Sequence, residues 1–154
     1  MNRDQQIQQL MDQAPQYGSS AGEVQIVAPV LRQFADRLRQ DEYYIVQNLD
    51  QQWVMTTLEH RSQPHLRKRV VYAYASLEAV KANHTVIDLQ TLALPLPTIQ
   101  ILFQLLALKP IDSLIFVESM DQSSCIEVSR AVLMQALEQH LEQIRPIRLP
   151  DNIA

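Results

Sequence analysis

The chain has 154 residues, of which 47% are hydrophobic, and its formal net charge is −4. This length suits one domain with its own core, and the acidic balance argues against general nucleic-acid binding, which needs a basic face. No apolar run approaches the roughly 20 residues of a membrane span, and the polar start lacks the apolar core of a secretory signal. Cys125 is the only cysteine, which excludes an internal disulfide. Together these features predict a location in the cytoplasm or on the cytosolic face of an assembly.

Two helices are expected before the first strand. Apolar side chains recur at spacings of three and four over about Asp4–Ala14 and again over about Glu23–Gln40, which predicts one apolar face on each helix. Ser20 is a candidate cap for the second helix, and Pro29 lies inside its pattern. The first helix is polar and rich in glutamine, so residues 1–18 are predicted to form a peripheral arm.

Three β-rich runs follow these helices. Tyr43–Gln47 and Trp53–Leu58 lie on either side of a short Asn/Asp turn, which is typical of a hairpin. A polar loop over His60–Lys68 then leads to a third strand over Arg69–Ala75. Ser76 can cap a short helix after this strand.

Strands and helices alternate in the next part of the chain. A short helix over Leu77–Ala82 precedes a fourth strand over Thr85–Leu89. The apolar, proline-containing segment Leu92–Pro97 is expected to be a stiff linker, because its last proline suits the start of a helix. That helix, over about Thr98–Leu108, is apolar nearly all round and should be buried.

A fifth strand over Asp112–Val117 is apolar enough to lie in the centre of a sheet. The last helix is expected over about Ser124–Ile144, and residues 145–154 form a tail. The predicted order is α-α-β-β-β-α-β-α-β-α. It indicates a single α/β (α+β) domain over residues 1–154, in which a mixed five-stranded sheet begins with an N-terminal hairpin and is covered by helices.

The scarcity of glycine limits the chemistry that the chain can perform. There are two glycines, Gly18 and Gly22, and both precede the first predicted strand. Loops that cradle phosphate need glycine, because backbone amides must approach the anion closely. The sequence therefore excludes the Walker loop, the dinucleotide-binding turn and the nucleophile elbow, and we expect no cofactor.

The remaining chemistry-bearing residues do not combine into a predicted site. No histidine pairs at helical spacing or neighbours a cysteine, so no metal site is predicted; the histidines are His60, His65, His84 and His140. Cys125 is expected near the start of the last helix. Two interpretations stay open for it, a reactive thiolate favoured by the helix dipole and an inert, partly buried side chain. The carboxylates near strand ends are Asp88, Asp112 and Glu118. Their spacing assigns no acid/base pair, so no catalytic residue is named.

Two groups of side chains are predicted to bind a partner. The aromatic group lies on the three β-rich runs and comprises Tyr43, Tyr44, Trp53, Tyr72 and Tyr74. The basic group lies between the second and third runs and comprises Arg61, Arg67, Lys68 and Arg69. The aromatic group indicates either a peptide groove or a core beneath helices. The basic group indicates either a contact for an acidic peptide or a solvated loop.

The stretch Val70–Val80, entered from a hairpin, resembles the middle of SseB-type domains. In that family a strand ends in an aromatic plus a small hydroxyl residue, and a helix then opens on acidic residues. The following strand, helix and strand run in a similar order, so the resemblance covers about Tyr43–Ser119. Ala75 stands where the family usually has threonine, and the glutamine-rich N-terminal helices are extra. The resemblance implies a small α/β module without known catalysis.

In its glutamine-rich composition and its layout, the chain also resembles small accessory proteins of cyanobacteria. These include assembly factors for photosynthetic complexes and for the carboxysome shell. The resemblance implies a chaperone-like role in the assembly of such a complex.

Together these features predict a non-enzymatic adaptor or assembly factor that binds another protein, through a peptide tail, without a cofactor. Two other classes stay open. One is a small-ligand enzyme or thiol sensor that uses Cys125 or the strand-end carboxylates. The other is a structural subunit, such as a homodimer, whose helix over Thr98–Leu108 is buried between copies. A closed pocket with convergent carboxylates would favour the enzyme, and an open groove or strand edge would favour the adaptor.

Overall fold

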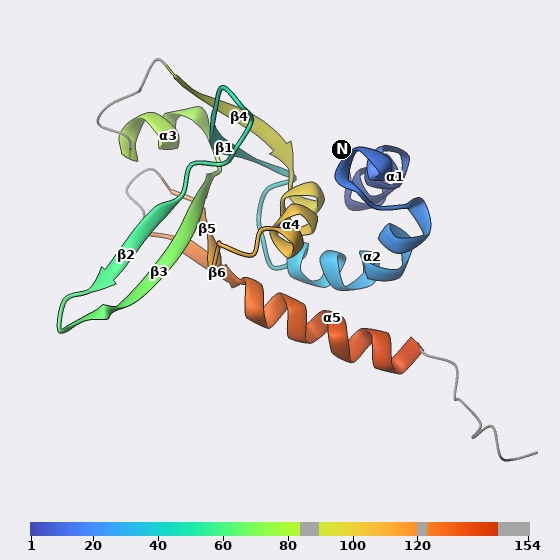
Figure 1. The fold of residues 1–154 in the computed structure, drawn as a ribbon. Coiled ribbons are helices and arrows are strands. Elements are labelled where there is room, and N and C mark those ends of the chain that lie inside the picture. Colours follow the sequence, from blue (N-terminus) through green and yellow to red (C-terminus); the bar gives the residue numbers. More distant parts are fainter. Residues whose placement is uncertain (84–89, 120–122, 145–154) are drawn as a thin grey trace, which may run out of the picture.

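A computed structural model of the protein describes residues 1–83, 90–119 and 123–144. These residues form helices packed on one mixed sheet, which confirms the predicted α/β class (Figure 1). The sheet has six strands, five of them in the order β4-β1-β3-β5-β6, while β2 pairs with β3 outside this path. The strands are β1 (Glu42–Asn48), β2 (Thr56–His60), β3 (Gln63–Tyr74), β4 (Thr91–Pro97), β5 (Ser113–Val117) and β6 (Cys125–Ser129).

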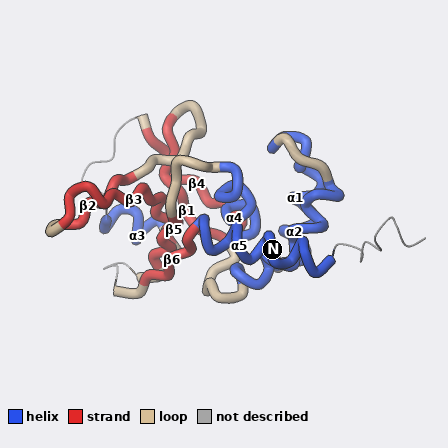
Figure 2. The backbone as a smooth tube through the Cα atoms, turned by 60° about the horizontal axis from the view of Figure 1, so that its bottom comes forward, coloured by secondary structure: helices blue, strands red, loops and turns tan. Residues whose placement is uncertain are grey.

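The helices divide unequally between the two faces of the sheet. The helices are α1 (Arg3–Gln13), α2 (Ala21–Ala35), α3 (Leu77–Asn83), α4 (Thr98–Ala107) and α5 (Arg130–Ile144), and a 3-10 turn, η1 (Ala14–Tyr17), follows α1. Figure 2 shows α1, α2, α4 and α5 gathered at one end of the molecule and the strands, with α3, at the other. The main core lies beneath α1, α2, α4 and α5, and a smaller cluster lies beneath α3. We call these the helical face and the α3 face.

Alternation along β3 assigns its side chains to these two faces. Val71 and Ala73 belong to the main core, whereas Tyr72 and Tyr74 belong to the cluster beneath α3. Neighbouring residues of a strand point to opposite faces, so the odd-numbered residues of this part of β3 lie on the helical face. The same rule places the side chain of Arg69 on the helical face.

The first helix is part of the core, which corrects the prediction of a peripheral arm. Leu10 is 2% exposed and Ala14 is 0% exposed. Gln6 is also buried, and its side chain joins three segments. Its amide donates to the carbonyl oxygen of Asp41 at 2.7 Å, and its Oε1 accepts the N–H of Ile99 at 3.0 Å. The periodic apolar positions of α1 therefore pack inward even though most of its residues are polar.

The second helix is capped as predicted but ends sooner. The hydroxyl of Ser20 accepts an N–H from the first turn, and the helix runs without interruption through Pro29. It ends at Ala35 rather than near Gln40. The guanidinium of Arg3 donates to the carbonyl oxygens of Ala35, at 2.7 Å, and of Gln40, at 3.2 Å. These contacts satisfy carbonyl groups at the end of the helix and in the turn beyond it.

Two segments are strands where other structure was predicted. β4 occupies the expected linker, and its prolines are tolerated because β4 lies at the edge of the sheet. β6 occupies the expected first turn of the last helix, because Ile126 and Val128 alternate with polar residues and pack on the core. Ser129 then accepts the N–H of Val132 at 3.3 Å as α5 begins. The predicted strand Thr85–Leu89 and the tail 145–154 lie outside the described residues.

A hairpin is present, but it joins β2 to β3 rather than the first two strands. The segment before β2 contacts β1 through the isolated bridge Gln47↔Trp53. β2 instead pairs with β3 in a register that includes Thr56↔Val70. The polar segment predicted as a loop therefore contains the first half of β3, and the hairpin projects from the sheet (Figures 1 and 2).

We predict that Gln6→Leu lowers the free energy of unfolding by about 1–3 kcal/mol, because it leaves the buried N–H of Ile99 and the carbonyl of Asp41 without their partner. Urea unfolding followed by circular dichroism measures this change. Gln8→Leu, at an exposed position of the same helix, should change stability by less than about 0.5 kcal/mol. Equal losses in the two variants would contradict the role given to Gln6.

Candidate functional site

The edge of β3 is open where the strand leaves the sheet. β3 pairs with β5 only from Val70 to Tyr74, although the strand begins at Gln63. On its other side, β2 pairs with β3 up to Val70. Before Val70, therefore, the edge of β3 that faces away from β2 has no strand partner in the described part of the chain.

Backbone hydrogen bonds fix the direction in which this edge points. The N–H of Arg69 donates to Oδ2 of Asp112 at 2.8 Å, and the N–H of Asp112 donates to the carbonyl oxygen of Arg69 at 2.8 Å. Both backbone groups of Arg69 thus point away from β2. Because the direction repeats every second residue, the N–H and C=O of Arg67 point the same way. No described residue binds these two groups. They point to the same side of β3 on which β5 pairs from Val70 onward, so they continue that row of backbone groups beyond the start of β5.

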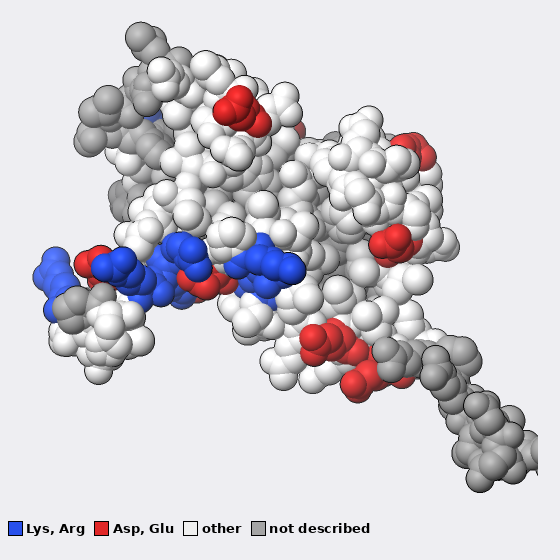
Figure 3. All heavy atoms as spheres, viewed as in Figure 1, with Lys and Arg blue, Asp and Glu red and all other residues white. Residues whose placement is uncertain are grey.

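Basic side chains surround this open edge. We define the basic strip as Arg61, Arg67, Lys68, Arg69 and Lys109. Figure 3 shows Lys and Arg side chains in a row that begins on the hairpin and runs toward the middle of the molecule. Arg67 pairs with Glu59 at 3.3 Å, and Lys68 pairs with Glu127. The remaining three, Arg61, Arg69 and Lys109, form no ion pair with described residues, so their charges are uncompensated.

A surface hollow adjoins the same edge. Its volume is about 370 Å³, and Lys68, Lys109, Asp112 and Glu127 are among the residues that line it. The ion pair with Lys68 and a 2.6 Å hydrogen bond from the hydroxyl of Ser113 lower the pKa of the Glu127 carboxyl. Glu127 is therefore ionised and holds Lys68 beside the edge at neutral pH.

The predicted aromatic residues do not form one surface. Tyr43 is 0% exposed and Tyr74 is 2% exposed, so the prediction that they contact a partner is wrong for these two. Tyr43 packs against Phe116 and donates its hydroxyl proton to Glu118. Burial is the main cause that raises the pKa of Tyr43, and burial also raises the pKa of Tyr74 to about 12. Both residues belong to the core.

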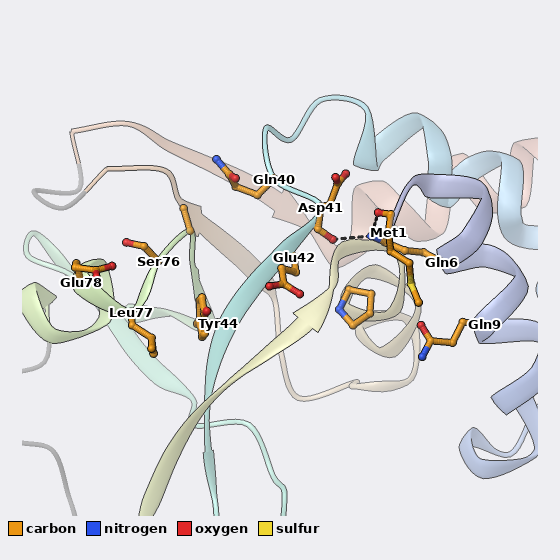
Figure 4. Close-up of a pocket in the computed structure, with 12 residues that line it drawn as sticks. Met1, Gln6, Gln9, Gln40, Asp41, Glu42, Tyr44, Ser76, Leu77 and Glu78 are labelled. Atoms are coloured by element: carbon orange, nitrogen blue, oxygen red, sulfur yellow. Dashed lines mark hydrogen bonds between the residues drawn. The ribbon is translucent and has the colours of Figure 1, made fainter.

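The other three aromatic residues lie partly exposed in different places. Tyr72 stacks on Tyr74 on the α3 face, with ring centroids 6.1 Å apart. Tyr44 lines a hollow of about 730 Å³ near the start of α3, where Glu42 and Glu78 also lie (Figure 4). Trp53 lines a third hollow at the end of α4. Of the predicted aromatic group, only Trp53 lines the hollow at the end of α4.

The structure separates the residues considered for catalysis. Asp112 and Glu118 flank the two ends of β5, which places them about 20 Å apart at roughly 3.3 Å per residue. Asp88 lies outside the described residues. Cys125 is exposed on β6, which corrects the prediction that it lies in the first turn of a helix. Cys125 therefore does not lie in the first turn of a helix, where the helix dipole would stabilise a thiolate.

The histidines show no common site in the described residues. His65 is exposed on β3, and a ring nitrogen of His140 lies 3.0 Å from the carbonyl oxygen of Ile26. His60 ends β2, and His84 is not described. Residues 1–83, 90–119 and 123–144 contain no group of three His, Cys, Asp or Glu side chains that could hold a metal ion.

The apolar helix α4 is buried within the chain itself. Ile99, Ile101, Leu102 and Leu105 are each 0% exposed. Only Ala107 is exposed along α4. The expected burial is therefore confirmed, and neighbouring elements of the same chain provide it. This removes the apolar surface on which the structural-subunit alternative was based.

Comparison of the chain with protein-family models, with curated proteins and with solved structures gives no match. Among the described helices, none combines the length and apolar character needed to cross a membrane. The candidate site therefore depends on the geometry of the hairpin. Sequence patterns had indicated the basic residues of the hairpin but not Lys109 or the open edge, because both depend on which strands pair.

We predict that Lys68→Gln raises the pKa of Glu127, because it removes the main interaction that lowers it. A carboxyl with a lowered pKa stabilises the folded chain above its unfolded pKa, and this contribution is lost as pH falls through the folded value. An NMR titration of the Glu127 carboxyl measures the shift. Arg67→Gln, on the opposite face, should leave it unchanged. An unchanged pKa in Lys68→Gln would contradict the pairing.

Proposed function

We propose that the chain is a non-enzymatic adaptor or assembly factor that holds an extended, acidic segment of a partner protein along the open edge of β3. The observation that supports this most directly is the backbone of Arg67, which has no partner among the described residues, continues the β5 ladder and is flanked by the basic strip. A partner segment in this position would add a strand to the sheet, and its backbone would receive hydrogen bonds from β3.

The isolation of the hairpin supports a binding role. A two-stranded hairpin without a third strand is at best marginally stable in water. An open edge also tends to pair with edges of other molecules, unless charged side chains prevent it. Like charges on the basic strip oppose pairing between two copies of this hairpin, whereas they attract an acidic segment. The same residues thus favour the partner and disfavour self-association.

The electrostatics also indicate the kind of affinity to expect. Arg61, Arg69 and Lys109 form no ion pair within residues 1–83, 90–119 and 123–144 of a chain whose formal net charge is −4. Exposed charges of this kind mainly accelerate association, and salt screens them. Binding of an acidic segment should therefore weaken as ionic strength rises.

The cellular setting is a further part of the proposal. The resemblance in composition and layout to cyanobacterial accessory proteins suggests a partner among the subunits of photosynthetic complexes or of the carboxysome shell. A chaperone-like factor would shield such a subunit's extended segment until the complex assembles. A cytoplasmic location is proposed on the single cysteine, since it indicates a chain that uses no disulfide.

We predict that the double variant Arg67→Glu/Lys68→Glu loses partner capture at least tenfold, because two attractive charges beside the edge become repulsive. Affinity capture with quantitative mass spectrometry measures this, and tiled peptides of the captured protein locate the segment. Lys81→Glu, an exposed reversal on α3, is the control and should retain capture. Equal capture by all three proteins, or a bound segment without acidic residues, would contradict the proposal.

The backbone contribution can be tested separately at the same position. Arg67→Gln removes the charge, whereas Arg67→Pro also removes the N–H that points to the open edge. We predict that the proline variant binds the identified segment about fivefold to tenfold more weakly than the glutamine variant, the loss expected for one hydrogen bond. Isothermal titration calorimetry provides the comparison. Equal affinities would show that the partner does not pair with this edge.

A further inference from the structure

An apolar hollow lies beside the basic strip, on the helical face. Its volume is about 400 Å³, and Trp53, Met55, Leu108, Pro110 and Ile111 are among the residues that line it. The segment before β2 forms one wall, while the end of α4 and the connection to β5 form the other. Met55 is 43% exposed, so its side chain remains largely open to solvent.

The register of the strands places the hollow and Arg69 of the basic strip on the same face. Trp53 pairs with Gln47, and alternation puts Trp53 and Met55 on the helical face. On the next strand, Arg69 lies opposite Thr57 and also belongs to this face. The uncompensated charge of Arg69 thus lies on the strand next to the wall formed by Met55.

The apolar hollow also has a neighbour in common with the open edge of β3. Ile111 lines both the apolar hollow and the polar hollow of about 370 Å³ that adjoins this edge. Lys109, from the basic strip, lines the latter. A segment paired with β3 would therefore run beside cationic groups, and its side chains on the helical face would point toward the apolar hollow.

We infer that the bound segment has a large aliphatic or aromatic side chain close to its acidic residues, and that this side chain enters the apolar hollow. The inference rests on the proposed function and specifies the chemistry of the partner. An all-acidic segment would leave Trp53 and Met55 uncovered, and a basic one would meet the charges of Arg69 and Lys109. A second copy of the hairpin carries the same positive strip, so charge disfavours it as the occupant.

Met55 suits such a contact. Its unbranched, polarisable side chain adapts to different apolar surfaces, and methionine recurs in sites that accept several peptide sequences. Trp53 supplies a rigid aromatic surface, a residue type enriched among the side chains that dominate binding energy. Together they favour a hydrophobic anchor of variable identity, while the strip fixes the acidic character of its neighbours.

Selection of random displayed peptides on the immobilised full chain tests the inference. We expect enriched peptides to combine Asp or Glu with Phe, Leu, Met or Trp, and to bind Met55→Glu at least about tenfold more weakly. The matched control is Leu77→Glu, because Leu77 is 41% exposed, close to the 43% of Met55, and lies on α3. It should bind these peptides as the unchanged chain does.

Trp53 is the only tryptophan, so its fluorescence reports on the apolar hollow directly. The best enriched peptide that lacks tryptophan should shift the emission of Trp53 to shorter wavelength, and replacement of its apolar anchor by alanine should weaken binding at least about tenfold. Peptides that bind Met55→Glu equally well and leave the emission unchanged would overturn the inference but not the proposed function. If no peptide were enriched, the proposed function would fail as well.

Discussion

The difference in length between β3 and its neighbours determines most of what is distinctive in this molecule. β3 has 12 residues, whereas β5 has 5 residues and begins to pair with β3 only at Val70. Backbone N–H and C=O groups need partners, and a strand that outlasts its neighbour leaves them unpaired on one side. Among the described strands, the first half of β3 is consequently paired with β2 alone. The need of these backbone groups for hydrogen-bond partners is the reason for the role proposed for the hairpin.

The rest of the fold holds that edge in place. The helices on the helical face bury the upper part of β3 through Val71 and Ala73, and Asp112 binds both backbone groups of Arg69 at the point where β5 begins. A segment added below this point would become ordered on binding, and this ordering costs entropy. Under the proposed function we therefore expect moderate, salt-sensitive affinity, which would allow the partner to be released during assembly.

The fold class and most helices could be predicted from periodicity, but strand pairing could not. Ser20 and Ser76 cap helices as expected, since caps depend on local sequence. The predicted pairing of β1 with the second β-rich run holds only at its start, where Trp53 bridges to Gln47, because Thr56–His60 pairs with β3 instead. The basic residues could be recognised in the sequence. That they lie beside an open strand edge could not, because the edge depends on where β2 and β5 pair with β3. The burial of Tyr43 and Tyr74 could not be predicted either, because the alternation of side chains along a strand does not reveal which face of the sheet the helices cover.

Hydrogen exchange at the amide of Arg67 tests the central claim most directly. In the free chain this N–H points to the open edge and should exchange rapidly, whereas the N–H of Arg69, bound to Asp112, should be protected. On addition of the captured partner segment, the Arg67 amide should become protected. Protection of Arg67 in the free chain, or an amide that stays unprotected when the partner segment is saturating, would contradict the account.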